Sequence, residues 1–121
     1  MKKIVNILIA CLLFYGASAN ASDWTEDDTN RQLVFYALKV IDWKQTLSVK
    51  NDPNLQEANP LLGPHPSDAR VNNFMIGAML LETGIAVYLD PEQRKYFQYI
   101  VIGFTGYTVG HNWSAGAKWG F

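Results

Sequence analysis

Four side chains that can ligate a metal or transfer a proton are spread along this sequence: Asp42, His65, Glu82 and His111. Carboxylates and imidazoles suit both a bound metal ion and a proton relay. No two of the four form a local metal motif, no nucleophile stands beside a base, and no glycine-rich phosphate loop is present. The sequence therefore predicts a candidate polar constellation and assigns no catalytic residue, metal or cofactor.

The same side chains also have a structural interpretation. Asp42 follows Lys39 by three residues, so the two can neutralise each other on one helical face. Glu82 can hydrogen-bond to Asn or Thr groups of a neighbouring helix, and both histidines can lie at an aqueous edge. This interpretation explains the same residues without catalysis, and we adopt it as the expectation.

Composition excludes several classes of protein. The chain has 121 residues, of which 49% are hydrophobic and 17% charged, against about 25% charged in ordinary soluble domains. Its formal net charge of −1 gives no basic surface for nucleic acid, so we expect no nucleic-acid partner. With Cys11 as its single cysteine, it can form neither an internal disulfide nor a cysteine-based zinc site. The length suits one domain.

The first 21 residues have the organisation of an export signal. A basic pair precedes an apolar stretch, and a small-residue Ala-Asn-Ala site follows. Cleavage after Ala21 would leave residues 22–121 as a single helical membrane domain; an uncleaved anchor is the alternative. The segment Leu8–Cys11 also has the form of a lipoprotein processing box, which would make the chain a lipid-anchored periplasmic module attached through Cys11.

Three helices are expected, over about residues 29–50, 69–89 and 91–112. Thr25 and Asp28 can cap the first, Ser67 the second, and Asp90 with Pro91 the third. Residues 51–68 hold four of the five prolines, and the residue before each proline disfavours helical geometry. This segment is therefore expected to be the one substantial loop.

Two of these helices are long and apolar. The run Val71–Leu89 has Glu82 as its only charge, and at 1.5 Å per residue it covers about 28 Å. The run Tyr96–Trp113 has no Lys, Arg, Asp or Glu and covers about 27 Å. Because a short turn joins them, we predict an all-α fold: a signal peptide followed by a small helical bundle with an antiparallel transmembrane hairpin.

Two other folds compete with this prediction. A buried helical hairpin in a soluble domain can be equally apolar, but the chain has too little amphipathic helix to cover two such helices. Residues 113–121 alternate as a strand of an outer-membrane barrel does, but even the smallest barrel needs eight strands of about ten residues each. The remaining periodicity is helical, so the membrane bundle is preferred.

Small residues mark faces along which helices can approach closely. Glycines recur on one side of each apolar run, which allows close backbone contact where lipid supplies no hydrophobic drive for association. We expect intrachain packing of the hairpin, with a homo-oligomer or another membrane protein as the alternative partner. The candidate packing residues are Gly77, Gly84, Gly103, Gly106 and Gly110.

Several short patterns together resemble a known family. They are Asp42-x-x-Gln45-Thr46, Glu57-x-Asn59-Pro60-Leu61-Leu62-Gly63, His65-Pro66-Ser67, Arg70-Val71-Asn72, Gln98-Tyr99, Ile102-Gly103 and His111-Asn112. Over roughly residues 40–112 the chain resembles small bacterial and phage membrane proteins of about three helices, of the DUF5658 type. The resemblance implies a helical membrane fold and transfers no catalytic role. A cleavable leader is not expected of every member.

These observations lead to an expected function and location. We expect a small exported integral protein of a bacterial inner membrane, with the lipid bilayer as its partner, acting by helix association or as an accessory factor. A membrane-embedded metal- or proton-dependent enzyme using Asp42, Glu82 and His65 or His111 is the alternative. Arg94 and Lys95 predict a cytoplasmic turn between the apolar runs, and the acidic segment 22–28 predicts a periplasmic start.

Overall fold

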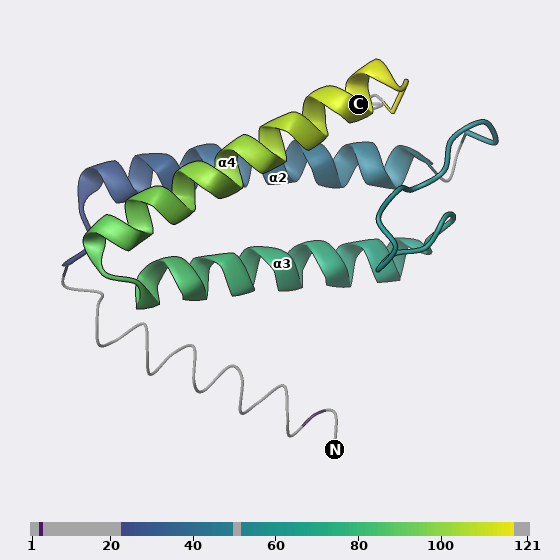
Figure 1. Cartoon of the computed structure of the whole chain (residues 1–121). Coiled ribbons are helices and arrows are strands. Elements are labelled where there is room, and N and C mark those ends of the chain that lie inside the picture. Colours follow the sequence, from purple (N-terminus) through teal and green to yellow (C-terminus); the bar gives the residue numbers. More distant parts are fainter. Residues whose placement is uncertain (1–2, 4–22, 50–51, 118–121) are drawn as a thin grey trace.

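The computed structural model describes residues 3, 23–49 and 52–117. Their main elements are three long helices, and no strand occurs among the residues described. The bounds are Glu26–Val49 for α2, Asp68–Tyr88 for α3 and Pro91–Ser114 for α4. The all-α prediction is confirmed for this part of the chain (Figure 1). The predicted export signal and Cys11 lie outside it.

Helix α2 begins three residues before its expected start at residue 29. The backbone N–H of Thr25 donates to Asp28 Oδ2 at 3.0 Å, and the N–H of Asp28 donates to Thr25 Oγ1 at 3.1 Å. This reciprocal pair is a capping box, which satisfies amide groups that have no partner within the helix. The caps expected from the sequence are thus confirmed. They begin the helix about one turn before the first residue of the apolar pattern.

The other two helices also begin at the caps expected from the sequence. Ser67 Oγ accepts from the N–H of Arg70, and Asp90 Oδ1 accepts from the N–H of Gln93. Pro91 occupies the first turn of α4, where its missing N–H leaves no hydrogen bond unmade. The short Leu89–Asp90 connection reverses the chain, so α4 returns toward the end at which α3 begins (Figure 1).

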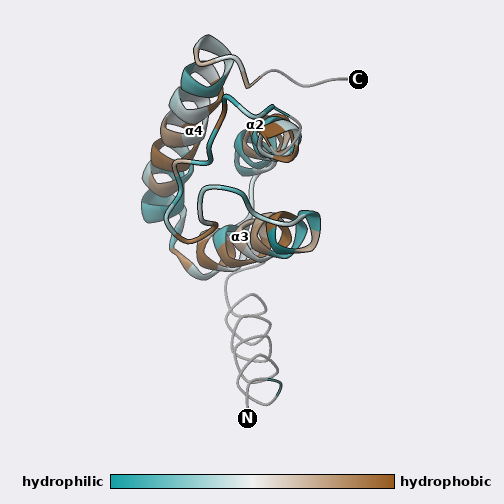
Figure 2. Cartoon of the chain, turned by 90° about the vertical axis from the view of Figure 1, so that its right-hand side faces the viewer, coloured by the Kyte–Doolittle hydropathy of each residue, from teal (hydrophilic) through white to brown (hydrophobic). Residues whose placement is uncertain are grey.

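The proline-rich segment contains no helix in its described residues 52–67, as expected. It folds back on itself, because the N–H of Glu57 donates to Pro64 O at 2.9 Å and Asn59 Oδ1 accepts from the N–H of Leu61. Gly63 takes a φ of 83° in this turn, a left-handed conformation that side chains rarely adopt. The loop closes over one end of the bundle (Figure 2).

The three helices form a triangle in end view, with unequal contacts between them (Figure 2). Helix α4 packs most extensively on α2, α3 packs less extensively on α2, and α3 and α4 make the fewest contacts with each other. Helices α2 and α4 run in the same direction along their shared seam (Figure 1). The pairing that holds the bundle together is therefore α2 with α4, two helices separated in the sequence by the whole of α3.

The interior of the bundle is mainly polar, and much of its surface is apolar. A small hydrophobic core of Leu62, Val71 and Met75 lies where the loop meets α3. Elsewhere the buried positions include many polar and charged side chains: Asp28, Gln32, Asp42, Gln45, Thr46, Glu82, Arg94, Gln98 and Thr105. The large exposed side chains on the helices are mostly apolar or aromatic: Leu33, Val34, Val40, Ile76, Leu80, Leu81, Tyr88, Tyr96, Tyr99, Ile100, Phe104, Tyr107 and Trp113.

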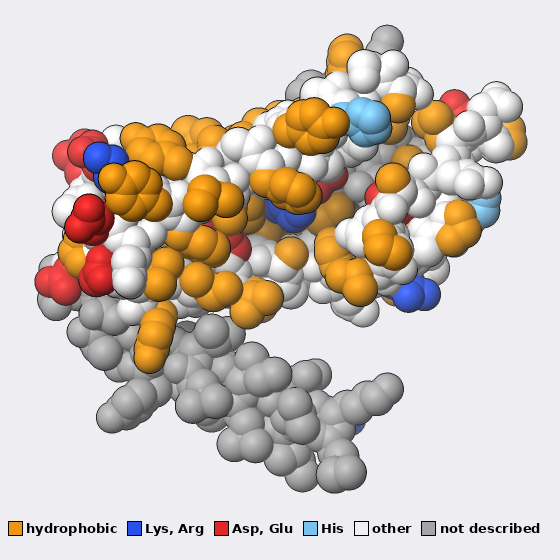
Figure 3. All heavy atoms as spheres, viewed as in Figure 1, with side chains coloured by type: hydrophobic (Ala, Val, Ile, Leu, Met, Phe, Trp, Pro, Cys, Tyr) orange, Lys and Arg blue, Asp and Glu red, His pale blue; other side chains and the backbone are white. Residues whose placement is uncertain are grey.

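One of the described helices meets a length-and-composition test for a membrane span. Helix α3 is long and apolar enough to cross a bilayer. Helix α4 has the length but does not pass the same test, because Gln, Thr, His and Asn lower its hydropathy. Hydrophobic side chains nevertheless cover much of the face formed by α3 and α4, while charged side chains gather at one end and in the hollow between these helices (Figure 3).

Candidate functional site

Two groups of polar side chains lie along the seam between α2 and α4. The arginine cluster consists of Asp28, Arg31, Arg94 and Gln98, at the end where α4 begins. The aspartate cluster consists of Lys39, Asp42, Gln45 and Asn112, near the end where α4 finishes. Both clusters join residues that are more than sixty positions apart in the sequence.

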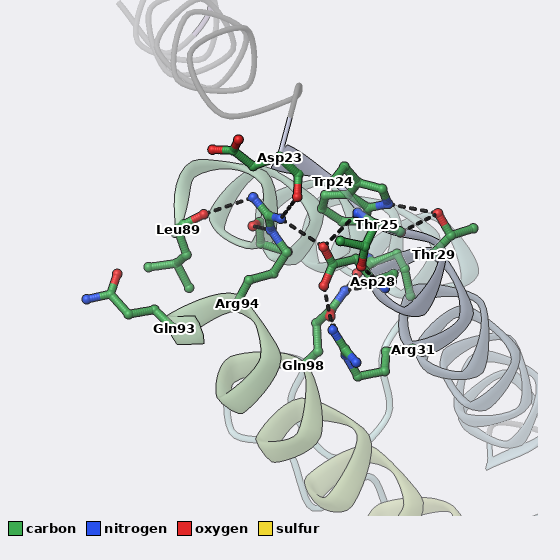
Figure 4. A network of polar contacts seen from close by, with 12 residues as sticks. Asp23, Trp24, Thr25, Asp28, Thr29, Arg31, Leu89, Gln93, Arg94 and Gln98 are labelled. Carbon is green, nitrogen blue, oxygen red and sulfur yellow. Dashed lines mark hydrogen bonds and ion pairs between the residues drawn. The ribbon is translucent and has the colours of Figure 1, made fainter. Parts of the chain in front are cut away.

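Arg94 is the centre of the arginine cluster and is fully buried, with 0% of its side chain exposed (Figure 4). Its Nη1 donates to Asp28 Oδ2 at 2.9 Å, and its Nε donates to Ala86 O at 2.6 Å. Its Nη2 donates to Leu89 O at 2.9 Å, so the guanidinium also satisfies carbonyls at the C-terminal end of α3. Arg94 therefore connects the starts of α2 and α4 with the end of α3.

Further contacts close the surroundings of this ion pair. The Trp24 ring lies 4.8 Å from the Arg94 guanidinium carbon, a cation–π arrangement that covers one side of the guanidinium. Arg31 forms a second ion pair with Asp28 at 2.5 Å and donates through Nε to Gln98 Oε1 at 2.8 Å. The Asp28 carboxylate thus faces two guanidinium groups and the Thr25 amide, which offsets the cost of burying its charge.

A chain of amides continues from the arginine cluster to α3. Gln98 Nε2 donates to Asp28 O at 3.0 Å and to Gln32 Oε1 at 3.1 Å. Gln32 Nε2 in turn donates to Glu82 Oε2 and, at 3.3 Å, to Thr83 Oγ1. Glu82 is buried, with 6% of the residue exposed, and its Oε1 has no hydrogen-bond partner among the described residues. Glu82 is therefore held by α2 through one oxygen only.

In the aspartate cluster, a charged pair is surrounded by amides. Lys39 Nζ lies 3.1 Å from Asp42 Oδ2, which confirms the pairing expected from their spacing. Asn112 Nδ2 donates at 3.3 Å both to Asp42 Oδ1 and to Gln45 Oε1. Gln45 is fully buried and donates to Val109 O at 3.1 Å. The second half of α4 is thereby fixed to α2 by hydrogen bonds.

A pocket of about 430 Å³ adjoins the aspartate cluster. Its lining comes from α2, the proline-rich loop, α3 and α4, and the hollow is visible between α4 and α3 in Figure 3. His111 contributes to the lining and lies parallel to the Tyr107 ring, with the ring centroids 6.0 Å apart. The polar lining residues are Lys39, Asp42, Thr46, Glu57, Asn59, Thr105, Thr108, His111 and Asn112.

The structure divides the four residues of the predicted constellation. Asp42 and His111 share the pocket, whereas Glu82 belongs to the amide chain and is not among the pocket residues. His65 is exposed in the loop and does not line the pocket. Glu82 has a partner on a neighbouring helix, as expected, but the closest donor is Gln32 rather than an Asn or Thr. Within the described ranges, no three His, Cys, Asp or Glu side chains come together to hold a metal.

The candidate packing glycines have different surroundings. A Cβ at Gly106 would lie 3.9 Å from Leu38 of α2, whereas a Cβ at Gly77, Gly103 or Gly110 would have no atom within 4 Å. Gly84 is half-buried. The neighbour of Gly106 is thus on α2 rather than on the other arm of the expected hairpin, and the role of these glycines in packing stays a prediction.

Sequence analysis missed the amides and the arginine that form most of the seam. Gln32, Gln45, Gln98, Arg94 and Asn112 were not among the candidate residues, although all five make hydrogen bonds between helices. A signal for them is present, because polar residues recur at spacings of three, four and seven positions along α2 and α4, which places them on one face of each helix.

Many residues that carry the family resemblance meet at the pocket although they are distant in sequence. Asp42 and Thr46 come from α2, Glu57 and Asn59 from the loop, and Asn112 from α4. Comparison with protein-family models, curated proteins and solved structures yields no match. The geometry of the chain itself therefore has to support a functional proposal.

Replacing Arg94 tests the arginine cluster. Arg94→Met keeps an apolar stem but leaves the buried Asp28 without its cross-helix cation, so we expect a loss of about 3–5 kcal/mol in the free energy of unfolding. Lys95→Met is the matched control, since Lys95 is the exposed neighbour of Arg94. The measurement is the unfolding of the purified chain in detergent micelles. Equal stability of the two variants would contradict this role of Arg94.

Replacing Glu82 separates a structural carboxyl from a chemically required one. Glu82→Gln keeps an oxygen that can accept from Gln32, so we expect normal accumulation and a change below about 1 kcal/mol in the free energy of unfolding. Glu82→Leu is the control, because it leaves the Gln32 amide short of an acceptor and costs about 1–3 kcal/mol. Equal damage by both variants would show that the carboxyl charge itself is required.

Proposed function

We propose that this chain is a small integral protein of a bacterial inner membrane that acts by helix association, as an accessory or structural subunit. The observation that carries the proposal is the inverted interior, in which polar side chains are buried and large apolar side chains are exposed. The partner of the exposed surface is the lipid bilayer, and no catalysis is assigned. Helices of 24, 21 and 24 residues measure about 36, 32 and 36 Å, enough to cross a hydrocarbon core of about 30 Å.

The free energy of burial supports this placement. Ile100 and Phe104 are 69% and 73% exposed. In water, each Å² of their exposed apolar surface would be less favourable than buried surface by about 25 cal/mol of free energy. In lipid the same surface costs nothing, and polar groups are better placed against one another than against hydrocarbon. Ionisable side chains within membranes generally face the interior of a bundle, as Asp42 and Arg94 do here.

The proposed role in helix association follows from the hydrogen bonds that buried polar side chains make between helices. Most buried polar side chains satisfy one another across α2, α3 and α4, which is the arrangement of a structural seam. Ile100, Phe104 and Tyr107 of α4 are exposed and available to a membrane-protein partner or a second copy. A membrane-embedded enzyme is the second candidate, favoured by the shared position of Asp42 and His111 in one pocket.

The arginine cluster bears on the expected topology. A cytoplasmic turn after α3 and a periplasmic start of α2 would place Arg94 and Asp28 on opposite sides of the bilayer, whereas their side chains form an ion pair at 2.9 Å (Figure 4). This ion pair favours a topology in which the start of α2 and the α3–α4 turn lie on the same side of the membrane. We infer that α2 crosses too, and that an exported start brings the α3–α4 turn into the periplasm with it. Arg70, in the first turn of α3, then falls on the cytoplasmic side, as the positive-inside rule favours.

The topology can be tested with the full chain by labelling single cysteines in a Cys11→Ser background. In intact cells, we expect a membrane-impermeant maleimide to label Glu92→Cys and to label His65→Cys only after lysis. Both positions are exposed, which makes them a matched pair. Labelling of His65→Cys alone in intact cells would reverse the orientation, and labelling of both would contradict a crossing by α3.

Extraction of membranes tests the proposal as a whole. The chain should sediment with membranes and remain there after washing with alkaline carbonate, because only the bilayer removes its exposed apolar side chains from contact with water. A peripheral protein expressed in the same cells should be released by the same wash. Recovery of this chain as a soluble monomer would contradict integral membrane embedding.

A further inference from the structure

We propose that the pocket beside the aspartate cluster binds one membrane lipid whose headgroup carries a primary ammonium. The inference rests on the proposed membrane location and goes beyond it by naming a ligand class. The pocket volume of about 430 Å³ lies within the range of small-molecule sites, though at its lower end. It lies between α3 and α4, which make few contacts with each other.

The lining of the pocket has an apolar part and a polar part, as a lipid has an acyl chain and a headgroup. Its apolar wall comes from Phe74 and Ala78 of α3 and Phe104 of α4. Ala78 lies ten residues into α3, or about 15 Å along its axis, which corresponds to the middle of a bilayer. Part of the polar lining, Glu57 and Asn59, lies in the loop at the end of the bundle, and the rest comes from α2 and α4. A lipid with its headgroup at the loop and its chain against α3 therefore matches both depth and polarity.

The charges in the pocket select the headgroup. Among the described lining residues, Asp42 and Glu57 are carboxylates, and Lys39 is the one ammonium and is paired with Asp42. Among the Asp, Glu and Lys side chains of the described lining there is one more carboxylate than ammonium, so an anionic headgroup is disfavoured. A primary ammonium complements this charge and also donates hydrogen bonds, which a quaternary ammonium cannot do.

Glu57 is held in a position to receive such a group. Its backbone N–H donates to Pro64 O at 2.9 Å, and its Oε1 accepts from the N–H of Asn59 at 2.9 Å. The carboxylate is thus fixed by the loop at the rim of the pocket rather than being free to swing into water. Fixed acceptors lower the ordering cost of binding.

The experiment compares three lipids in competition. The full chain is reconstituted in nanodiscs containing equal parts of phosphatidylethanolamine, phosphatidylcholine and phosphatidylglycerol, then released gently for native mass spectrometry. We expect the ethanolamine lipid to be retained about tenfold over the choline lipid, the ratio that one charge-assisted hydrogen bond supplies. The glycerol lipid should be retained least.

Variants locate the retained lipid. Glu57→Gln should abolish the preference for ethanolamine over choline, whereas Glu92→Gln, which changes an exposed carboxylate outside the pocket, should keep it. Ala78→Phe fills the apolar wall and should lower retention of all three lipids. Loss of preference in Glu57→Gln without loss in Glu92→Gln supports the site.

Other outcomes overturn it. Equal retention of the ethanolamine and choline lipids, a preference for the glycerol lipid, or insensitivity to Glu57→Gln would each contradict the proposed headgroup. A dimer that disappears in Ala78→Phe would assign the pocket to a second copy of the chain instead. A chain that resists carbonate but shows no lipid preference would refute this inference alone, whereas a chain extracted by carbonate would refute the membrane proposal as well.

Discussion

The ion pair between Asp28 and Arg94 is the interaction on which the rest of the structure depends. Through Arg94 it joins the first turn of α4 to the first turn of α2 and to the last carbonyls of α3, so one guanidinium fixes three helix ends. A buried ion pair is costly unless its remaining donors and acceptors are also satisfied. Here backbone carbonyls, the Thr25 amide and Arg31 supply those partners.

From this point the polar seam sets the register of α2 against α4. Gln98 meets Gln32 about one turn further along, and Asn112 meets Asp42 and Gln45 near the opposite end. In the proposed membrane location the hydrophobic effect would not drive the helices together, so close packing and such hydrogen bonds would decide which faces meet. Helix α3 is attached to α2 through Glu82, Thr83 and Asn72, and its last turn is attached to α4 through Arg94. Its few other contacts with α4 leave room for the pocket between these two helices.

Local features of the fold could be predicted from the sequence, and long-range pairings could not. Thr25, Ser67 and Asp90 are recognisable as caps because each acts within three residues of itself, and the Lys39–Asp42 pair is likewise local. The partner of Glu82 depends on which face of α2 is turned toward α3, and no local spacing contains that information. For the same reason α4 was expected to pack on its sequence neighbour α3, although α2 offers the complementary polar groups.

The claim that lipid surrounds an inverted bundle can be measured directly by spin labelling in bilayers. Labels at Leu80 and Phe104 face outward, whereas a label at the buried Phe35, which does not line the pocket, is the interior position. The account predicts that Leu80 and Phe104 are strongly relaxed by oxygen, which concentrates in lipid, and weakly by a water-soluble nickel complex, while Phe35 is shielded from both. Strong relaxation of Leu80 and Phe104 by the nickel complex would place these side chains in water and contradict the account.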